Sequence, residues 1–121
     1  MRDKVMISRT LENEIGPFVH TVFFWLKNPE HKKDREAFEK AIQKLIQTNP
    51  QGISSHIGKP ADSEKREVVD NSFTYCYIMI FTDLETQNAY QTDPTHMSFI
   101  EEASHLWKRV LVYDSLALNK F

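Results

Sequence analysis

Two segments of the chain carry apolar or aromatic side chains at nearly every position. Residues 18–27 read FVHTVFFWLK, and residues 73–81 read FTYCYIMIF. Aromatic and β-branched residues favour strands, and a strand that is apolar on both alternating faces needs a packed layer on each side. We therefore expect two central strands in a sheet that is covered on both faces.

Two other segments have apolar residues at spacings of three and four, the pattern of an amphipathic helix. Residues 28–49 begin with an Asn-Pro pair that suits an N-cap and a first-turn proline, and a second Asn-Pro pair ends the pattern. Residues 82–107 begin with the capping-box sequence TDLE, pause near Gln91 and restart at Asp93-Pro94. We expect one helix in the first segment and an interrupted helix, running through Trp107, in the second.

The remaining elements complete an α+β order. Residues 52–61 predict a short strand, residues 62–72 a charged loop, and residues 109–118 a final strand. The order β-α-β-β-α-β is that of the ferredoxin-like fold. We expect this domain to span residues 17–121, preceded by a polar N-terminal extension, residues 1–16, that lies outside the fold.

One face of the expected sheet has no helix to cover it. The helices of a ferredoxin-like monomer pack on a single face, yet the alternation leaves apolar and aromatic side chains on the other face as well. An apolar face of that size is not expected to stay in water. A second copy packed sheet against sheet would bury it, so the sequence predicts a homodimer.

Charge and composition narrow the range of partners. The net charge is −2, from 15 basic and 17 acidic residues, so we expect no nucleic-acid partner. No segment approaches the ~20 apolar residues that cross a bilayer, so no membrane partner is expected either. The N-terminus does not resemble a secretory signal, and the single cysteine, Cys76, cannot form an internal disulfide. A cytoplasmic location is the expectation.

Several motifs, taken in their order and spacing, resemble the stress-responsive A/B barrel domain (Dabb) family. They are FVHTVFFWLK, IGKPA, FTYCYIMIF, AYQTDPTHMSF and WKRVLVYDS, and the similarity extends over about residues 17–118. The resemblance implies a dimeric α+β barrel with a cavity between sheet and helices. Most family members have no established activity. One, a plant olivetolic acid cyclase, closes a linear polyketide by intramolecular aldol condensation without a metal or cofactor.

The resemblance also implies which residues form the site. The catalytic histidine of the cyclase corresponds to His96 in DPTH, and its catalytic tyrosine corresponds to Tyr90 in AYQT. Two other polar pocket positions fall on His20 and Asp114. A further pocket histidine of the cyclase is replaced here by Tyr75, which changes the polarity expected of the cavity.

His96 has two interpretations. Asp93 as N-cap and Pro94 at N1 place His96 near N3, where the positive helix end favours a neutral imidazole. A neutral imidazole is a general base near pH 7, and Tyr90 would donate a hydrogen bond to a carbonyl and stabilise a developing enolate. In the alternative interpretation, His96 only packs and hydrogen-bonds at the helix start, with Tyr90 in the core.

Asp114 lies on an otherwise apolar strand face, where a buried carboxylate needs a partner. The ferredoxin-like order places His20 on the neighbouring strand, so we expect the two to pair, either as a structural pair or as ligand contacts. Metal binding is not expected, because no His-Glu-x-x-His motif, cysteine pair or acidic cluster has suitable spacing. No cofactor is expected.

The sequence leaves two functions open. The first is a dimeric barrel that binds a small hydrophobic or aromatic molecule, with acid–base chemistry by His96 and Tyr90. Inward-facing apolar residues would then contact the ligand, namely Phe24, Tyr75, Tyr77 and Met79. The second is a non-enzymatic stress-related or interaction module whose barrel is packed solid by the same side chains.

Overall fold

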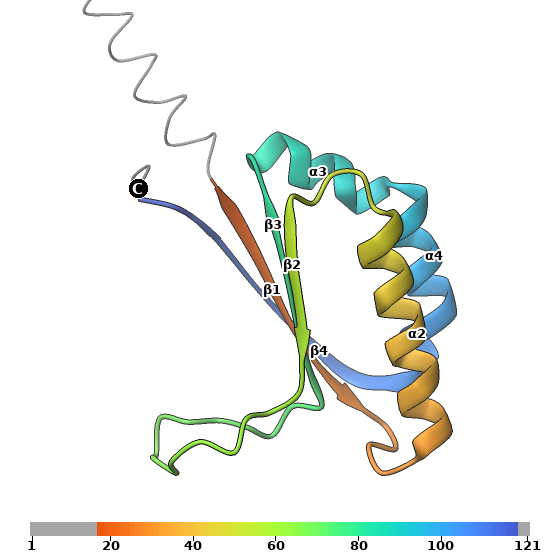
Figure 1. Ribbon diagram of the computed structural model, residues 1–121, viewed down its shortest axis with the longest axis vertical. Coiled ribbons are helices and arrows are strands. Elements are labelled where there is room, and N and C mark those ends of the chain that lie inside the picture. The colour runs from red at the N-terminus through yellow and green to blue at the C-terminus, as the bar shows by residue number, and fades with distance from the viewer. Residues whose placement is uncertain (1–16, 119–121) are drawn as a thin grey trace, which may run out of the picture.

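The fold is a four-stranded antiparallel sheet with helices on one face (Figure 1). The computed structural model describes residues 17–118, so the predicted extension over residues 1–16 and the last three residues of the predicted domain lie outside it. The strand order across the sheet is β2-β3-β1-β4, the ferredoxin-like α+β arrangement. In chain order the elements are β1 (Phe18–Leu26), α2 (Lys32–Thr48), β2 (Ser54–Gly58), β3 (Tyr75–Phe81), α3 (Leu84–Thr92), α4 (Pro94–Ala103), the 3₁₀ turn η1 (Ser104–Leu106) and β4 (Trp107–Leu116).

The predicted starts of the first two helices were wrong by a few residues. α2 begins after His31 rather than at residue 28, because the His31 side chain accepts a hydrogen bond from the Asp34 N–H at 3.3 Å. α3 is capped by Asp83 rather than by the preceding threonine. The Asp83 carboxylate accepts both the backbone N–H and the hydroxyl of Thr86, at 2.7 and 2.6 Å, so it satisfies more donors than a hydroxyl would.

The predicted break in the second helical segment is confirmed, whereas its predicted end is wrong. α3 and α4 are separate helices that share Asp93, which is the C-cap of one and the N-cap of the other, with Pro94 at the start of α4. The order is therefore β-α-β-β-α-α-β. The helical segment stops before Trp107, because Trp107 pairs with Leu26 at the beginning of β4.

The core lies between the helices and the inward face of the two central strands. Along β1 and β3, alternate side chains are buried, and the intervening ones are half-buried on the opposite face. α2 contributes an apolar stripe that faces these strands, so the helix and the sheet bury their apolar sides against each other. The largest fully buried side chains are Tyr77, Tyr90, Phe38, Phe81, Leu26, Ile42, Leu45 and Met79.

The face of the sheet away from the helices, the outer face, is only partly covered. The loop between β2 and β3 extends on this side (Figure 1). It places Phe73 against Phe23, with ring centroids 5.0 Å apart, and Ser72 accepts a hydrogen bond from the Trp25 indole at 3.1 Å. Tyr113, on the same face of β4, is still 59% exposed, so apolar surface remains on this side.

Candidate functional site

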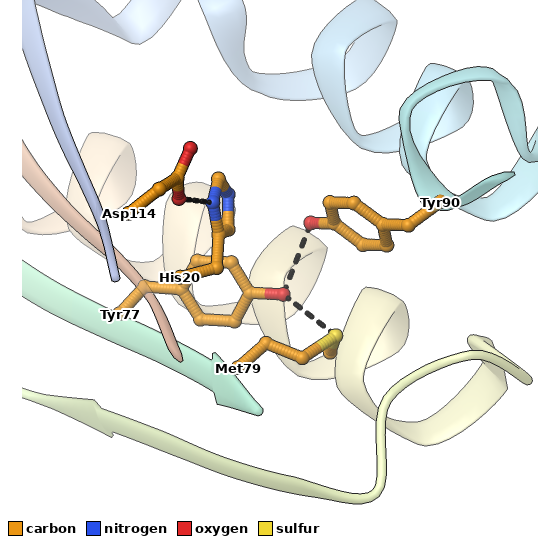
Figure 2. Close-up of polar contacts among 5 residues, drawn as sticks. All are labelled: His20, Tyr77, Met79, Tyr90 and Asp114. Carbon is orange, nitrogen blue, oxygen red and sulfur yellow. Dashed lines mark hydrogen bonds and ion pairs between the residues drawn. The ribbon is translucent and has the colours of Figure 1, made fainter. Parts of the chain in front are cut away.

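His20 and Asp114 form a hydrogen-bonded pair on neighbouring strands. They stand opposite one another in the β1–β4 register, and the His20 Nδ1 lies 2.6 Å from the Asp114 Oδ1 (Figure 2). This contact confirms the pairing predicted from the sequence. A carboxylate only accepts, so Nδ1 of His20 carries a hydrogen and the ring orientation is fixed. His20 is buried, whereas the Asp114 side chain is 40% exposed.

Tyr77 of β3 and Tyr90 of α3 bring two buried hydroxyls together. Their oxygens are 3.0 Å apart, and the Tyr77 hydroxyl also lies 3.3 Å from the Met79 sulfur (Figure 2). Burial raises the pKa of Tyr90 to about 12 and the pKa of Tyr77 further still. Both phenols therefore keep their protons near neutral pH. Each hydroxyl has one hydrogen, so the Tyr90 proton is free for a ligand in the arrangement in which Tyr77 donates to Tyr90 and not to the Met79 sulfur.

His96 is the third residue of α4, as predicted. Its Nδ1 lies 3.1 Å from the carbonyl oxygen of Gln91, near the end of α3. A carbonyl only accepts, so Nδ1 carries the hydrogen and a neutral ring has a lone pair on Nε2. Burial lowers the pKa of His96, and the neighbouring His20 lowers it further, although the Gln91 bond acts in the opposite direction. The ring lies beside Tyr90, with centroids 4.5 Å apart.

Four polar side chains form a closed hydrogen-bonded ring that holds the start of α4. Asn49 donates to Gln51 and Thr95 at 2.8 and 2.9 Å, and Gln51 donates to Asp93 at 3.0 Å. The Thr95 hydroxyl closes the ring by donating to Asp93 at 2.5 Å. These bonds tie the loop after α2 to the helix turn that carries His96, so the position of His96 depends on residues from distant parts of the chain.

The two histidines and the tyrosine pair border one cavity of about 220 Å³. Six of the eight predicted site residues line it, namely His20, Phe24, Tyr77, Tyr90, His96 and Asp114. The rest of the lining is apolar except for Gln91, and it comprises Val22, Phe99, Ile100, Trp107, Val110 and Val112. One polar edge thus faces an otherwise apolar space.

Two predicted ligand residues are not part of this lining. The Tyr75 hydroxyl donates to Glu39 at 2.5 Å, and its ring stacks on Phe38 with centroids 4.6 Å apart. Met79 packs directly against Gly52, so that a Cβ atom at position 52 would lie only 2.5 Å from the Met79 sulfur. Both residues are on the inward face, as alternation predicted, and they stand opposite Phe24 and His20 in the β1–β3 register, but their side chains pack against Glu39, Phe38 and Gly52 instead of lining the cavity.

The apolar lining from β4 and α4 was not among the site residues predicted from the sequence. Val110 and Val112 share a strand face with Asp114, so alternation along β4 could have predicted them as lining residues once Asp114 was placed in the site. Trp107 was missed because it was assigned to a helix. Within residues 17–118, no group of three or more His, Cys, Asp or Glu side chains is arranged to hold a metal ion. None of the helices in this part of the chain is long and apolar enough to cross a membrane.

The fold and cavity define a ferredoxin-like α+β domain with a small pocket between its sheet and its helices. The family model of the stress-responsive A/B barrel domain (Dabb) matches residues 18–117. The chain therefore belongs to this family. A comparison with curated proteins gives no match.

Solved structures share the fold at low sequence identity. A Dabb family protein from Mesorhizobium loti is 21% identical with a TM-score of 0.69, and the match covers 86% of this chain and 99% of that protein. The hydroxynitrile lyase from Passiflora edulis is 17% identical with a TM-score of 0.72, covering 88% and 98%. A dimeric ferredoxin-like protein of unknown function from Thermobifida fusca is 13% identical with a TM-score of 0.68, covering 84% and 92%.

Proposed function

We propose that this protein binds a small hydrophobic molecule in the cavity and catalyses cofactor-free acid–base chemistry on it. The single observation that carries the proposal is the neutral His96 ring, whose Nδ1 hydrogen bond to Gln91 leaves Nε2 as a base at the cavity wall. The step is removal of a proton from a carbon next to a carbonyl group. The electrons of the broken C–H bond form an enolate, and His96 becomes an imidazolium that later returns the proton.

Tyr90 is the group that stabilises the enolate. Its ring lies beside His96, and its hydroxyl is buried within the tyrosine pair. A Tyr90 pKa of about 12 keeps the phenol protonated near neutral pH, so it donates a hydrogen bond to the substrate oxygen. Such a bond is strongest on the negative oxygen of the enolate, and stabilisation of this kind lowers the barrier.

The presence of the cavity supports the ligand-binding function and argues against the alternative of a solidly packed, non-enzymatic barrel. Its volume of about 220 Å³ is equivalent to roughly seven water molecules at liquid density. This space suits a single aromatic ring with a short substituent. The Passiflora edulis neighbour is described as a hydroxynitrile lyase, which supports the view that an enzyme can be built on this fold.

We also propose that the functional unit is a homodimer built through the outer face. Apolar side chains on this face of β1 and β3 are only half-buried in the single chain, and Tyr113 of β4 is exposed. The dimeric state of the Thermobifida fusca neighbour supports this assembly.

Proton exchange on acetophenone tests the chemistry without knowledge of the natural substrate. The full chain in D₂O is expected to accelerate replacement of the methyl protons by deuterium, measured by proton NMR. His96→Gln should lower the rate by about 10²–10⁴-fold, the usual effect of a lost general base. Tyr90→Phe should also lower it, because the enolate loses a hydrogen bond.

His105→Gln is the matched control, since His105 is exposed and does not line the cavity. It should exchange the ketone protons as fast as the unsubstituted protein. Equal rates for His96→Gln and His105→Gln would contradict the assignment of His96 as the base. A rate no greater than that of buffer would favour the non-enzymatic module.

A further inference from the structure

The cavity has a marked charge asymmetry. Among its lining residues, all of which lie in the described part of the chain, none is lysine or arginine, and Asp114 is the one acidic side chain. The Asp114 carboxylate is engaged by His20 through one oxygen at 2.6 Å. Apart from the two histidines, no lining group can therefore offer a positive charge to a ligand.

Asp114 also lies on the open side of the cavity. Val110 and Val112 are 43% and 45% exposed although their side chains share the inward strand face with His20, and the Asp114 side chain is 40% exposed. All three belong to β4, the edge strand of the sheet. The cavity thus meets solvent along β4, and a molecule that enters there passes the carboxylate.

We propose that the cavity excludes anions and admits uncharged or cationic molecules, and that Asp114 is the residue that determines this selectivity. The inference rests on the proposed ligand-binding function. An anion that enters the cavity would lose its hydration and be repelled by the Asp114 carboxylate. No lysine or arginine lines the cavity to offset these costs. An uncharged carbonyl compound loses much less hydration and has no charge to be repelled or compensated, whereas a cation gains from the carboxylate and from the aromatic faces around it.

Three probes of nearly one shape separate charge from size. Benzamide, benzoate and the benzamidinium ion each carry one ring and one planar three-atom head, with charges of 0, −1 and +1 at pH 7. Binding to the full chain is measured by chemical-shift titration of the ¹⁵N-labelled protein. Benzamidinium is expected to bind at least as tightly as benzamide. Benzoate is expected to bind at least about tenfold more weakly than benzamide, equivalent to about 1.4 kcal/mol.

Asp114→Asn tests whether the carboxylate causes the difference. The amide oxygen of asparagine still accepts a hydrogen bond from His20, whereas the charge is lost. The gap between benzamide and benzoate should shrink, and benzamidinium should bind more weakly. Glu101→Gln is the matched control, because Glu101 is an exposed residue of α4 outside the cavity lining. It removes the same charge and should leave all three affinities unchanged.

Salt dependence gives a second measurement on the unsubstituted protein. A partly exposed carboxylate is screened by ions, so higher NaCl should narrow the gap between benzamide and benzoate. Benzoate binding as tight as benzamide binding would overturn the inference, because it would mean that His20 or His96 supplies a positive charge. The inference would also be overturned if the difference in affinity between benzamide and benzoate stayed the same in Asp114→Asn and at high salt. If none of the three probes shifts a cavity resonance, the proposed binding function itself fails.

Discussion

At the scale of single residues, His96 has two tasks at once. Its Nδ1 hydrogen satisfies the Gln91 carbonyl near the end of α3, where helix carbonyls lack partners within the helix. The same bond fixes which nitrogen is protonated, so the local need for a helix cap determines which nitrogen can act as a base. In the proposed function, a residue whose tautomer is set by the backbone needs no carboxylate partner of its own to accept a proton.

The pH dependence of ketone exchange follows from this arrangement. Burial lowers the pKa of His96 from its ordinary value of 6.5, and only the unprotonated ring accepts a proton. The exchange rate should therefore fall as the pH drops through a midpoint below 6.5, and it should level off above that midpoint. An NMR titration of the His96 ring should give the same midpoint. Two clearly different midpoints would contradict the role of His96 in the rate.

The same shift has a consequence for stability. The unfolded chain protonates His96 at higher pH than the folded chain does, so it binds more protons in the interval between the two pKa values. The contribution of His96 to the free energy of unfolding is therefore complete above the unfolded pKa. It is progressively lost as the pH falls through 6.5 towards the lower folded value.

At the scale of elements, a ring of polar side chains spans the break between α3 and α4. Asn49 is the central member, because its oxygen also accepts hydrogen bonds from the backbone N–H groups of Gln51 and Gly52 at 3.0 and 2.9 Å. Asn49 is buried at the end of α2, and its amide reaches Thr95 in the first turn of α4. One side chain therefore joins two helices and the approach to β2.

Replacement of Asn49 by alanine should both destabilise the folded protein and increase the mobility of the first turn of α4, which carries His96. Asn49→Ala is expected to lower the free energy of unfolding by about 1–3 kcal/mol, because buried donors lose their acceptor. Urea denaturation measures the change, and faster amide hydrogen exchange in the first turn of α4 would locate it. Asn71→Ala, at an exposed position in the β2–β3 loop, is the control and should change the stability little. Equal stabilities of the two variants would show that the ring does not hold the junction.

Hydrophobic periodicity was sufficient to predict the central strands β1 and β3, since burial of a whole face determines them. The interruption of the second helical segment followed from Asp93-Pro94, which starts α4. The helix starts were less predictable, because Thr82 and Asp83 are both suitable caps, and because His31, which caps α2, is not a preferred cap residue whereas Asn28 is. The pairing of His20 with Asp114 followed from alternation combined with strand order. By contrast, alternation gives the face of Tyr75 and Met79 but not their tertiary partners Glu39 and Gly52, so it did not exclude them from the cavity lining.

At the scale of the whole molecule, the outer face predicts the assembly. Light scattering should give about 28.4 kDa, twice the 14.2 kDa of one chain. Tyr113→Lys should shift the mass towards one chain, because it places a charge on the outer face without disturbing the core. Met97→Lys is the control, since Met97 is similarly exposed but belongs to α4 on the opposite side of the sheet. A mass of 14.2 kDa for the unsubstituted protein at micromolar concentration would contradict the dimer.

The exposed position of β4 has a consequence for how such a protein can diversify. The cavity residues on β1, β3 and α3 also hold the core together, so most changes to them reduce stability. Val110, Val112 and Asp114 line the same cavity from an edge strand where substitutions cost far less folding free energy. Under the proposed ligand-binding function, ligand preference can therefore change through substitutions in β4 while the rest of the molecule is preserved. A single scaffold could in this way acquire new ligands in successive descendants without first gaining extra stability.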